Sequence, residues 1–200
     1  MKKVFVLALA FAGLTSAVKA QTGSILVGGN VGLTSTSDKN TSPTTKETIF
    51  TFSPTVGYQF SSHWTAGLTA DFNSDKNDNG TVTKDNSWDL GPFIRYAKPL
   101  SDIFSVYGQA QATFGSYKST SEFGGNTTTT SQGSTVNVTV FPAVFINLKN
   151  SFGLNFNVGG LTYGATSPKS GYGEQSTSFN VNFGKVVNIG ISKNFGGHRK

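Results

Sequence analysis

Residues 50–60 read FTFSPTVGYQF, and every second side chain in this stretch is apolar or aromatic apart from one proline. The intervening positions hold Thr, Ser, Thr, Gly and Gln. Successive side chains of a β-strand point to opposite faces of the strand. This period of two therefore predicts a strand with one apolar face and one polar face.

The same alternation recurs along the chain, so that eight segments have the pattern of such a strand. The composition agrees, because 24 Gly and 17 Phe accompany a charged fraction of only 13%. A helical enzyme needs more charged residues on its surface, whereas Phe, Val, Tyr and Thr favour β-structure. The other segments are residues 25–33, 64–72, 88–96, 104–114, 136–146, 152–158 and 187–195.

Residues 1–20 have the pattern of a secretory signal peptide. Lys2 and Lys3 precede an apolar run over residues 4–14, and small residues lead to Ala20, after which we expect cleavage. The run is shorter than the roughly 20 apolar residues of a membrane-anchoring helix. Loss of Lys2, Lys3 and Lys19 lowers the formal charge from +6 to +3. The mature domain is expected to span residues 21–200, and its charge pattern gives no sign of nucleic-acid binding.

Short and long connections alternate between the expected strands. Short periplasmic turns and long extracellular loops are typical of bacterial outer-membrane barrels. We therefore predict that the long polar loops face the environment and that both termini lie in the periplasm. The short connections are residues 61–62, 98–102 and 149–150, and the long ones are residues 35–45, 74–86, 119–134 and 167–175.

Aromatic residues stand in pairs eight positions apart on the apolar face of three expected strands. At a strand tilt near 40°, eight positions correspond to roughly 20 Å along the membrane normal. The apolar band of an outer-membrane barrel is about 25 Å tall and has an aromatic girdle at each rim. The expected girdle residues are Phe50, Tyr58, Trp64, Phe72, Trp88, Tyr96, Phe104, Phe114, Phe152 and Phe195.

A secreted barrel with its apolar face inside is the alternative to a membrane barrel. The apolar face carries many Phe, Trp, Tyr and Ile side chains, and the opposite face is rich in Gly, Thr, Ser and Asn. An eight-stranded barrel is only just wide enough for side chains to fill its interior. The large groups therefore fit outside, and we predict an all-β fold, an eight-stranded antiparallel transmembrane up-and-down β-barrel.

Three hairpins share a strand proline, and their motifs include FSPTVGY at residues 52–58 and LGPFIRYAKPLSD at residues 90–102. With GGLTYG at residues 159–164, these motifs resemble small outer-membrane β-barrel proteins of the Bacteroidetes type. The resemblance covers nearly all of the mature chain. It implies a cell outer membrane location, surrounding lipid, and recognition by the barrel assembly machinery through the C-terminal strand. Such barrels usually end on an aromatic residue, whereas here five residues follow Phe195. The prolines are compatible with bulges or with edge-like registers.

The sequence offers little chemistry. His63 and His198 are the two histidines, and both fall at the end of the short turns. Without Cys the chain has no disulfide, thiolate metal site or cysteine nucleophile. The acidic stretch over residues 75–85 lacks the final Glu of a calcium loop. We predict no enzyme activity, no metal and no cofactor.

The polar face is expected to line the barrel interior, and two interpretations of it remain. Its side chains either form a hydrogen-bonded plug or line a restricted path for small solutes. The leading hypothesis is therefore a structural or surface-interaction barrel that acts through its long extracellular loops, with an unidentified ligand. The alternative is a narrow channel or porin. The interior residues singled out are Asp71, Asp89, Arg95, Gln109, Gln111, Asn155 and Asn157.

Overall fold

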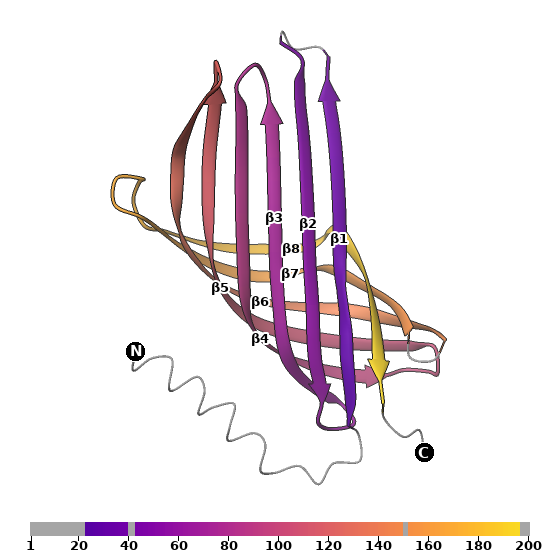
Figure 1. Ribbon diagram of the computed structural model, residues 1–200. Helices are drawn as coiled ribbons and strands as arrows, with labels where there is room; N and C mark the ends of the chain where they lie inside the picture. Colours follow the sequence, from indigo (N-terminus) through magenta and orange to yellow (C-terminus); the bar gives the residue numbers. More distant parts are fainter. Residues whose placement is uncertain (1–22, 40–42, 150–151, 197–200) are drawn as a thin grey trace.

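The computed structural model describes residues 23–39, 43–149 and 152–196, and they form eight long strands (Figure 1). In these residues no helix is long and apolar enough to cross a membrane. The expected signal peptide and His198 lie outside the described residues. The strands are β1 (Ser24–Asp38), β2 (Thr45–Gln59), β3 (Trp64–Asp78), β4 (Val82–Pro99), β5 (Phe104–Phe123), β6 (Asn126–Lys149), β7 (Phe152–Pro168) and β8 (Ser176–Phe195).

Each strand pairs antiparallel with the next, and β1 also pairs with β8, which closes the sheet into a barrel. The predicted eight-stranded up-and-down topology is therefore confirmed. The large apolar side chains of the alternating segments point outward, and all ten expected girdle residues lie on the outer surface with exposed fractions of 39–48%. The arrangement with the apolar face inside is wrong for this chain.

Two of the four polar stretches that were expected to be long loops, residues 74–86 and 119–134, are mostly paired strand, whereas residues 169–175 connect β7 and β8 outside the strands. β3 and β4, for example, pair from Trp64 to Asp78, so that residues 79–81 alone connect them. β5 and β6 are joined by Gly124 and Gly125, both with positive φ, as a two-residue hairpin turn requires. The prediction failed because both faces of these hairpins are polar, which removes the apolar alternation but leaves backbone pairing intact. We call the end with these polar hairpins the hairpin end, and the opposite end the turn end.

The strand prolines interrupt pairing on one side only. Pro54 pairs with Gly29 on β1, while Ser53 and Pro54 have no partner on β3. Pro92 is matched with Leu68 on β3 and faces a similar gap toward β5. Neither gap changes the register, so these two prolines lie neither at bulges nor at edges. Pro142 differs, because the register between β6 and β7 shifts beside it.

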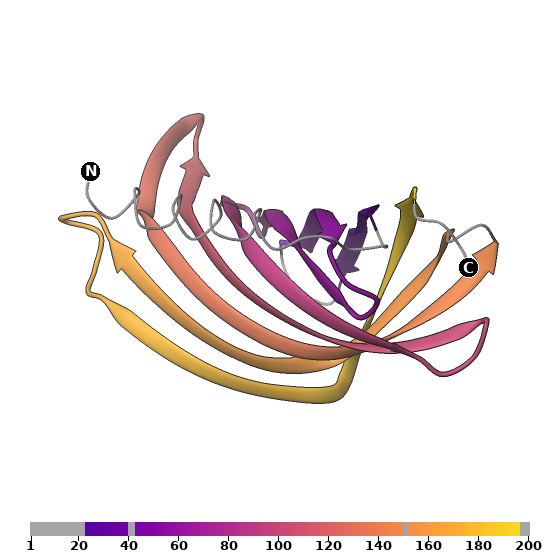
Figure 2. The ribbon, with the colours of Figure 1, turned by 90° about the horizontal axis from the view of Figure 1, so that it is seen from below.

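The contact between the first and last strands is short. β1 and β8 pair only from Ile25, opposite Phe195, to Gly29, opposite Ile191. Beyond these pairs β8 bends and follows β7 away from β1 (Figure 2). At the bend Gly184 has a φ of 73°, and the register between β7 and β8 shifts between Asn157 and Gly159. The rest of β1, toward Asp38, is paired on its β2 side alone.

Candidate functional site

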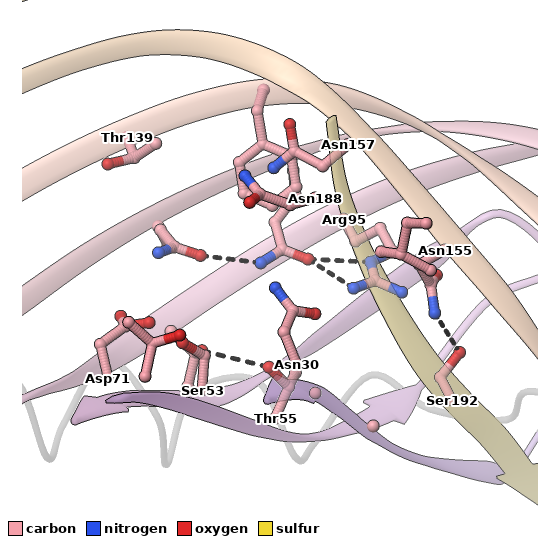
Figure 3. Close-up of a pocket in the computed structure, with 18 of the residues that line it drawn as sticks. Asn30, Ser53, Thr55, Asp71, Arg95, Thr139, Asn155, Asn157, Asn188 and Ser192 are labelled. Atoms are coloured by element: carbon pink, nitrogen blue, oxygen red, sulfur yellow. Dashed lines mark hydrogen bonds between the residues drawn. The ribbon is translucent and has the colours of Figure 1, made fainter. Parts of the chain in front are cut away.

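The barrel interior holds a polar cavity of about 610 Å³ (Figure 3). Asp71 and Arg95 lie on opposite sides of it. Asp89 does not line this cavity, but it also points inward and accepts hydrogen bonds from Thr135 at 2.6 Å and Asn137 at 3.4 Å on β6. The predicted interior residues that line the cavity are Asp71, Arg95, Gln109, Gln111, Asn155 and Asn157.

Arg95 is held on amides and aromatic rings. Its Nε and Nη2 donate to Gln109 Oε1 at 2.9 and 2.7 Å, and Gln109 Nε2 donates to Gln111 Oε1 at 2.8 Å. The guanidinium carbon lies 4.1 Å from the ring centroid of Tyr107 and 5.7 Å from that of Phe93. Such contacts are favourable cation–π geometry. Within the described residues, Arg95 forms no salt bridge.

Other interior residues join strands across the barrel. The Tyr107 hydroxyl donates to Asn155 Oδ1 at 3.1 Å, and Asn155 Nδ2 donates to Ser192 Oγ at 2.8 Å. This chain of hydrogen bonds connects β5, β7 and β8. Asp71 is hydrogen-bonded to Ser53. The backbone N–H of Gly159 donates to Asn157 Oδ1 at 2.7 Å. Each interior residue singled out from the sequence thus has a hydrogen-bond partner, as buried polar groups require.

An apolar layer is buried inside the barrel in the half nearer the turn end, and the polar-face pattern did not predict it. Leu26, Phe93, Tyr107 and Ala143 are all less than 10% exposed. The Phe93 ring lies over Gly67 of β3, where an added Cβ would be only 2.7 Å from a ring carbon. Phe93 stands at a polar-face position, between Gly91 and Arg95, so the alternation alone does not mark it as part of an apolar layer. The sequence feature that could have predicted this layer is an aromatic residue on the polar face, Phe93, whose strand partner Gly67 has no side chain.

The two aromatic bands follow from the strand register. Trp64 pairs with Tyr96 at the turn end, with ring centroids 5.0 Å apart in an edge-on arrangement. Phe72 pairs with Trp88 toward the hairpin end. Eight residues separate the bands on β3 and β4, which matches the height of a bilayer's hydrocarbon region.

No catalytic geometry is present around the described histidine. His63 Nδ1 is 2.8 Å from the hydroxyl of the adjacent Ser62, and its ring stacks on Tyr96 at 5.6 Å. The first contact lies within the turn and the second joins the turn to β4, and within the described residues His63 forms no ion pair with an acid that could complete a triad. In the described part of the chain, no cluster of three His, Cys, Asp or Glu residues has the geometry to hold a metal ion.

A family model described as the outer membrane protein beta-barrel domain matches residues 4–184. The chain belongs to this family. It is therefore an integral outer-membrane β-barrel surrounded by lipid, and its outward apolar belt is the surface that contacts that lipid. A comparison with curated proteins found no match.

Among solved structures, the chain is similar to Neisserial surface protein A, with 13% identity and a TM-score of 0.51. That alignment covers 87% of this chain and 98% of the other. Ail, the attachment invasion locus protein of Yersinia pestis, aligns with 13% identity over 88% of this chain and 99% of Ail, with a TM-score of 0.44. The likeness to Neisserial surface protein A concerns the fold alone.

Proposed function

We propose that this outer-membrane barrel has a structural and surface-interaction role, with its polar hairpins outside the cell. The main support is the apolar layer of Leu26, Phe93, Tyr107 and Ala143, which are buried inside the barrel in the half nearer the turn end, with Leu26 and Tyr107 lining the cavity. A water-filled pore needs a continuous polar path. In this proposal the cavity is a pocket and not a path across the membrane, and the hairpins are the surface available to other molecules.

The proposed orientation places both termini in the periplasm. The start of β1 and the end of β8 lie at the turn end, together with the connections at residues 60–63 and 100–103. Outer-membrane barrels have their larger extramembrane parts on the extracellular side. Here the polar ends of β3 to β6 extend well beyond the aromatic band at the hairpin end, whereas Trp64 and Phe104 begin their strands at the turn end. Phe195, which ends β8 on the outer surface, is then available to the assembly machinery that inserts barrels. The third predicted turn, at residues 149–150, reaches into a part of the chain outside the described residues.

The proposal includes the absence of an enzyme activity. Outer-membrane enzymes that act on lipid need an acid–base pair within hydrogen-bond reach of the nucleophile. His63 has a serine neighbour but lies at the turn end and stacks on a girdle tyrosine. Its surroundings suit a turn residue at the membrane rim.

Conductance in a planar bilayer tests the structural role against the channel alternative, which the polar cavity favours. The refolded protein is expected to give no stable single-channel current. Replacing the two largest members of the apolar layer, as Phe93→Ala/Tyr107→Ala, is expected to open a small conductance because the cavity then reaches the turn end. The outward substitution Phe114→Ala, which leaves the layer intact, is the control. Stable conductance by the wild-type protein would make it a channel.

A further inference from the structure

A groove of about 460 Å³ lies on the outer surface of β2 to β5, at the edge of the apolar belt nearer the hairpin end. Phe50, Phe72 and Trp88 form its aromatic floor, and their side chains are 44–48% exposed. Beyond this floor, toward the hairpin end, the lining changes to hydroxyl, amide and ammonium groups. These polar members are Ser74, Asn86, Ser116 and Lys118.

The strand register places the groove residues next to one another. Trp88 pairs with Phe72 on one side and with Ser116 on the other. Asn86 pairs with Lys118, and Ser74 Oγ donates to Asn86 Oδ1 at 2.8 Å. Directly paired residues have Cβ atoms about 4.5–5.5 Å apart. The aromatic, amide and ammonium groups therefore form one continuous surface.

Lysines concentrate just above this groove. Lys76 of β3 stands directly opposite Lys84 of β4, and Lys84 is in turn beside Asn86 and the exposed Lys118. Two like charges directly opposite each other destabilise a strand pair. Lys84 has one ion pair, with Glu122 at 3.7 Å, and in the described chain Lys76 and Lys118 have none. The opposed lysines thus leave a positive surface that an anion would stabilise.

Among the carboxylates of the same hairpin, Asp78 shares the outer face with Lys76, and it stands opposite Lys46 of β2. The other two acids lie on the opposite face. Asp75 pairs with Asp85, and both occupy positions of the opposite parity to Lys76 and Lys84. Alternation therefore directs these acids to the interior face and the lysines to the outer face. The nearby outer surface of β3 and β4 retains its excess positive charge.

The lysines lie at the depth of lipid head groups. Lys76 and Lys84 are four residues beyond Phe72 and Trp88, and Lys118 is two residues beyond Ser116. For strands tilted by about 40°, these offsets place the lysines roughly 5–10 Å above the aromatic band. Aromatic rings mark the edge of the hydrocarbon region. The ammonium groups are consequently level with phosphates attached to the first sugars or glycerols of the leaflet.

We propose that this groove binds the phosphorylated saccharide head group of an outer-leaflet glycolipid. Lys76, Lys84 and Lys118 contact the phosphate through charge-assisted hydrogen bonds. Ser74, Asn86 and Ser116 bind sugar hydroxyls, and the acyl chains lie along the belt below Trp88. The inference rests on the proposed orientation, because only a hairpin end outside the cell meets that leaflet.

Nanodiscs test the binding directly. The protein is inserted into phosphatidylcholine nanodiscs with increasing lipid A, and the lipid retained after detergent exchange is measured by mass spectrometry. The chain has two tryptophans, so a Trp64→Phe background leaves Trp88 as the fluorescence reporter in the groove. We expect saturable retention of lipid A together with a change in Trp88 emission.

Two triple variants separate the groove from general attraction. Lys76→Ala/Lys84→Ala/Lys118→Ala is expected to weaken lipid A binding by about tenfold, since three charge-assisted contacts are lost. Lys98→Ala/Lys169→Ala/Lys193→Ala removes the same charge away from the groove and should leave binding unchanged. Arginine at the three groove positions should retain it. Equal losses in both alanine triples would overturn the proposed site, provided that all variants show the heat-dependent gel mobility of a folded barrel.

The choice of probe identifies the ligand chemistry. Phosphatidylglycerol supplies a phosphate without a sugar, and inorganic phosphate supplies the anion alone. Retention as strong as that of lipid A by either probe would overturn the glycolipid assignment. In a nanodisc both ends of the barrel are in contact with lipid head groups, whatever the orientation in cells. A negative result there therefore counts against the groove and not against the proposed orientation. Orientation in cells is measured separately by thiol labelling.

Discussion

Gln109 Oε1 accepts two hydrogen bonds from Arg95, at 2.9 and 2.7 Å, and is thus the principal polar partner of an interior cation. A neutral amide holds the guanidinium here, while the acids Asp71 and Asp89 are bonded to hydroxyl and amide groups elsewhere. The aromatic faces of Tyr107 and Phe93 complete the setting of Arg95. The cation therefore contacts two rings of the apolar layer and also lines the polar cavity.

Removing the Gln109 amide is expected to destabilise the barrel. Gln109→Leu leaves Arg95 without its acceptor, and a lost hydrogen bond to a charged group costs about 1.5–3 kcal/mol. Gln109→Glu keeps acceptor oxygens for Arg95 and should cost far less. Urea titrations of refolding into lipid vesicles measure both free energies of unfolding. Equal destabilisation by the two substitutions would show that packing of Gln109, and not its acceptor, matters.

Gly67 and Gly108 provide a matched pair of strand glycines. A Cβ on Gly67 meets the Phe93 ring at 2.7 Å and also meets the backbone of β2, whereas a Cβ on Gly108 meets nothing within 4 Å. Gly67→Ala is expected to cost about 1–3 kcal/mol, as overpacking does. Gly108→Ala should be neutral or stabilise by up to about 1 kcal/mol. Similar unfolding curves for the two variants would mean that Phe93 does not pack over β3.

Thiol labelling tests the orientation, and the absence of native Cys makes it unambiguous. Asn79→Cys and Thr128→Cys, in two polar hairpins, are expected to react with an impermeant maleimide on intact cells. Ser62→Cys, in a connection at the turn end, should react only after the outer membrane is permeabilised. Labelling of Ser62→Cys alone on intact cells would reverse the proposed orientation.

The alternation of FTFSPTVGYQF and its relatives was sufficient to predict the fold, because the lipid-facing side of every strand has to be apolar. It also predicted which residues face inward, and Asp71, Arg95 and Asn155 do so. It did not predict the hairpin extensions, whose pairing depends on backbone hydrogen bonds that any polar residue allows. Phe93 was missed for a related reason, since a single inward ring opposite Gly67 leaves no periodic signal.

The unequal pairing of β1 should be visible in hydrogen exchange. Residues 30–38 of β1 pair with β2 but not with β8, whereas residues 105–111 of β5 pair with both neighbours. Alternate N–H groups of an antiparallel strand point to opposite neighbours. Every second amide of residues 30–38 is therefore expected to exchange rapidly, while residues 105–111 are protected throughout. NMR-detected exchange in nanodiscs provides the measurement. Open strand edges are unfavourable in hydrocarbon, so uniform protection of residues 30–38 would mean that β1 acquires a second partner strand in the membrane.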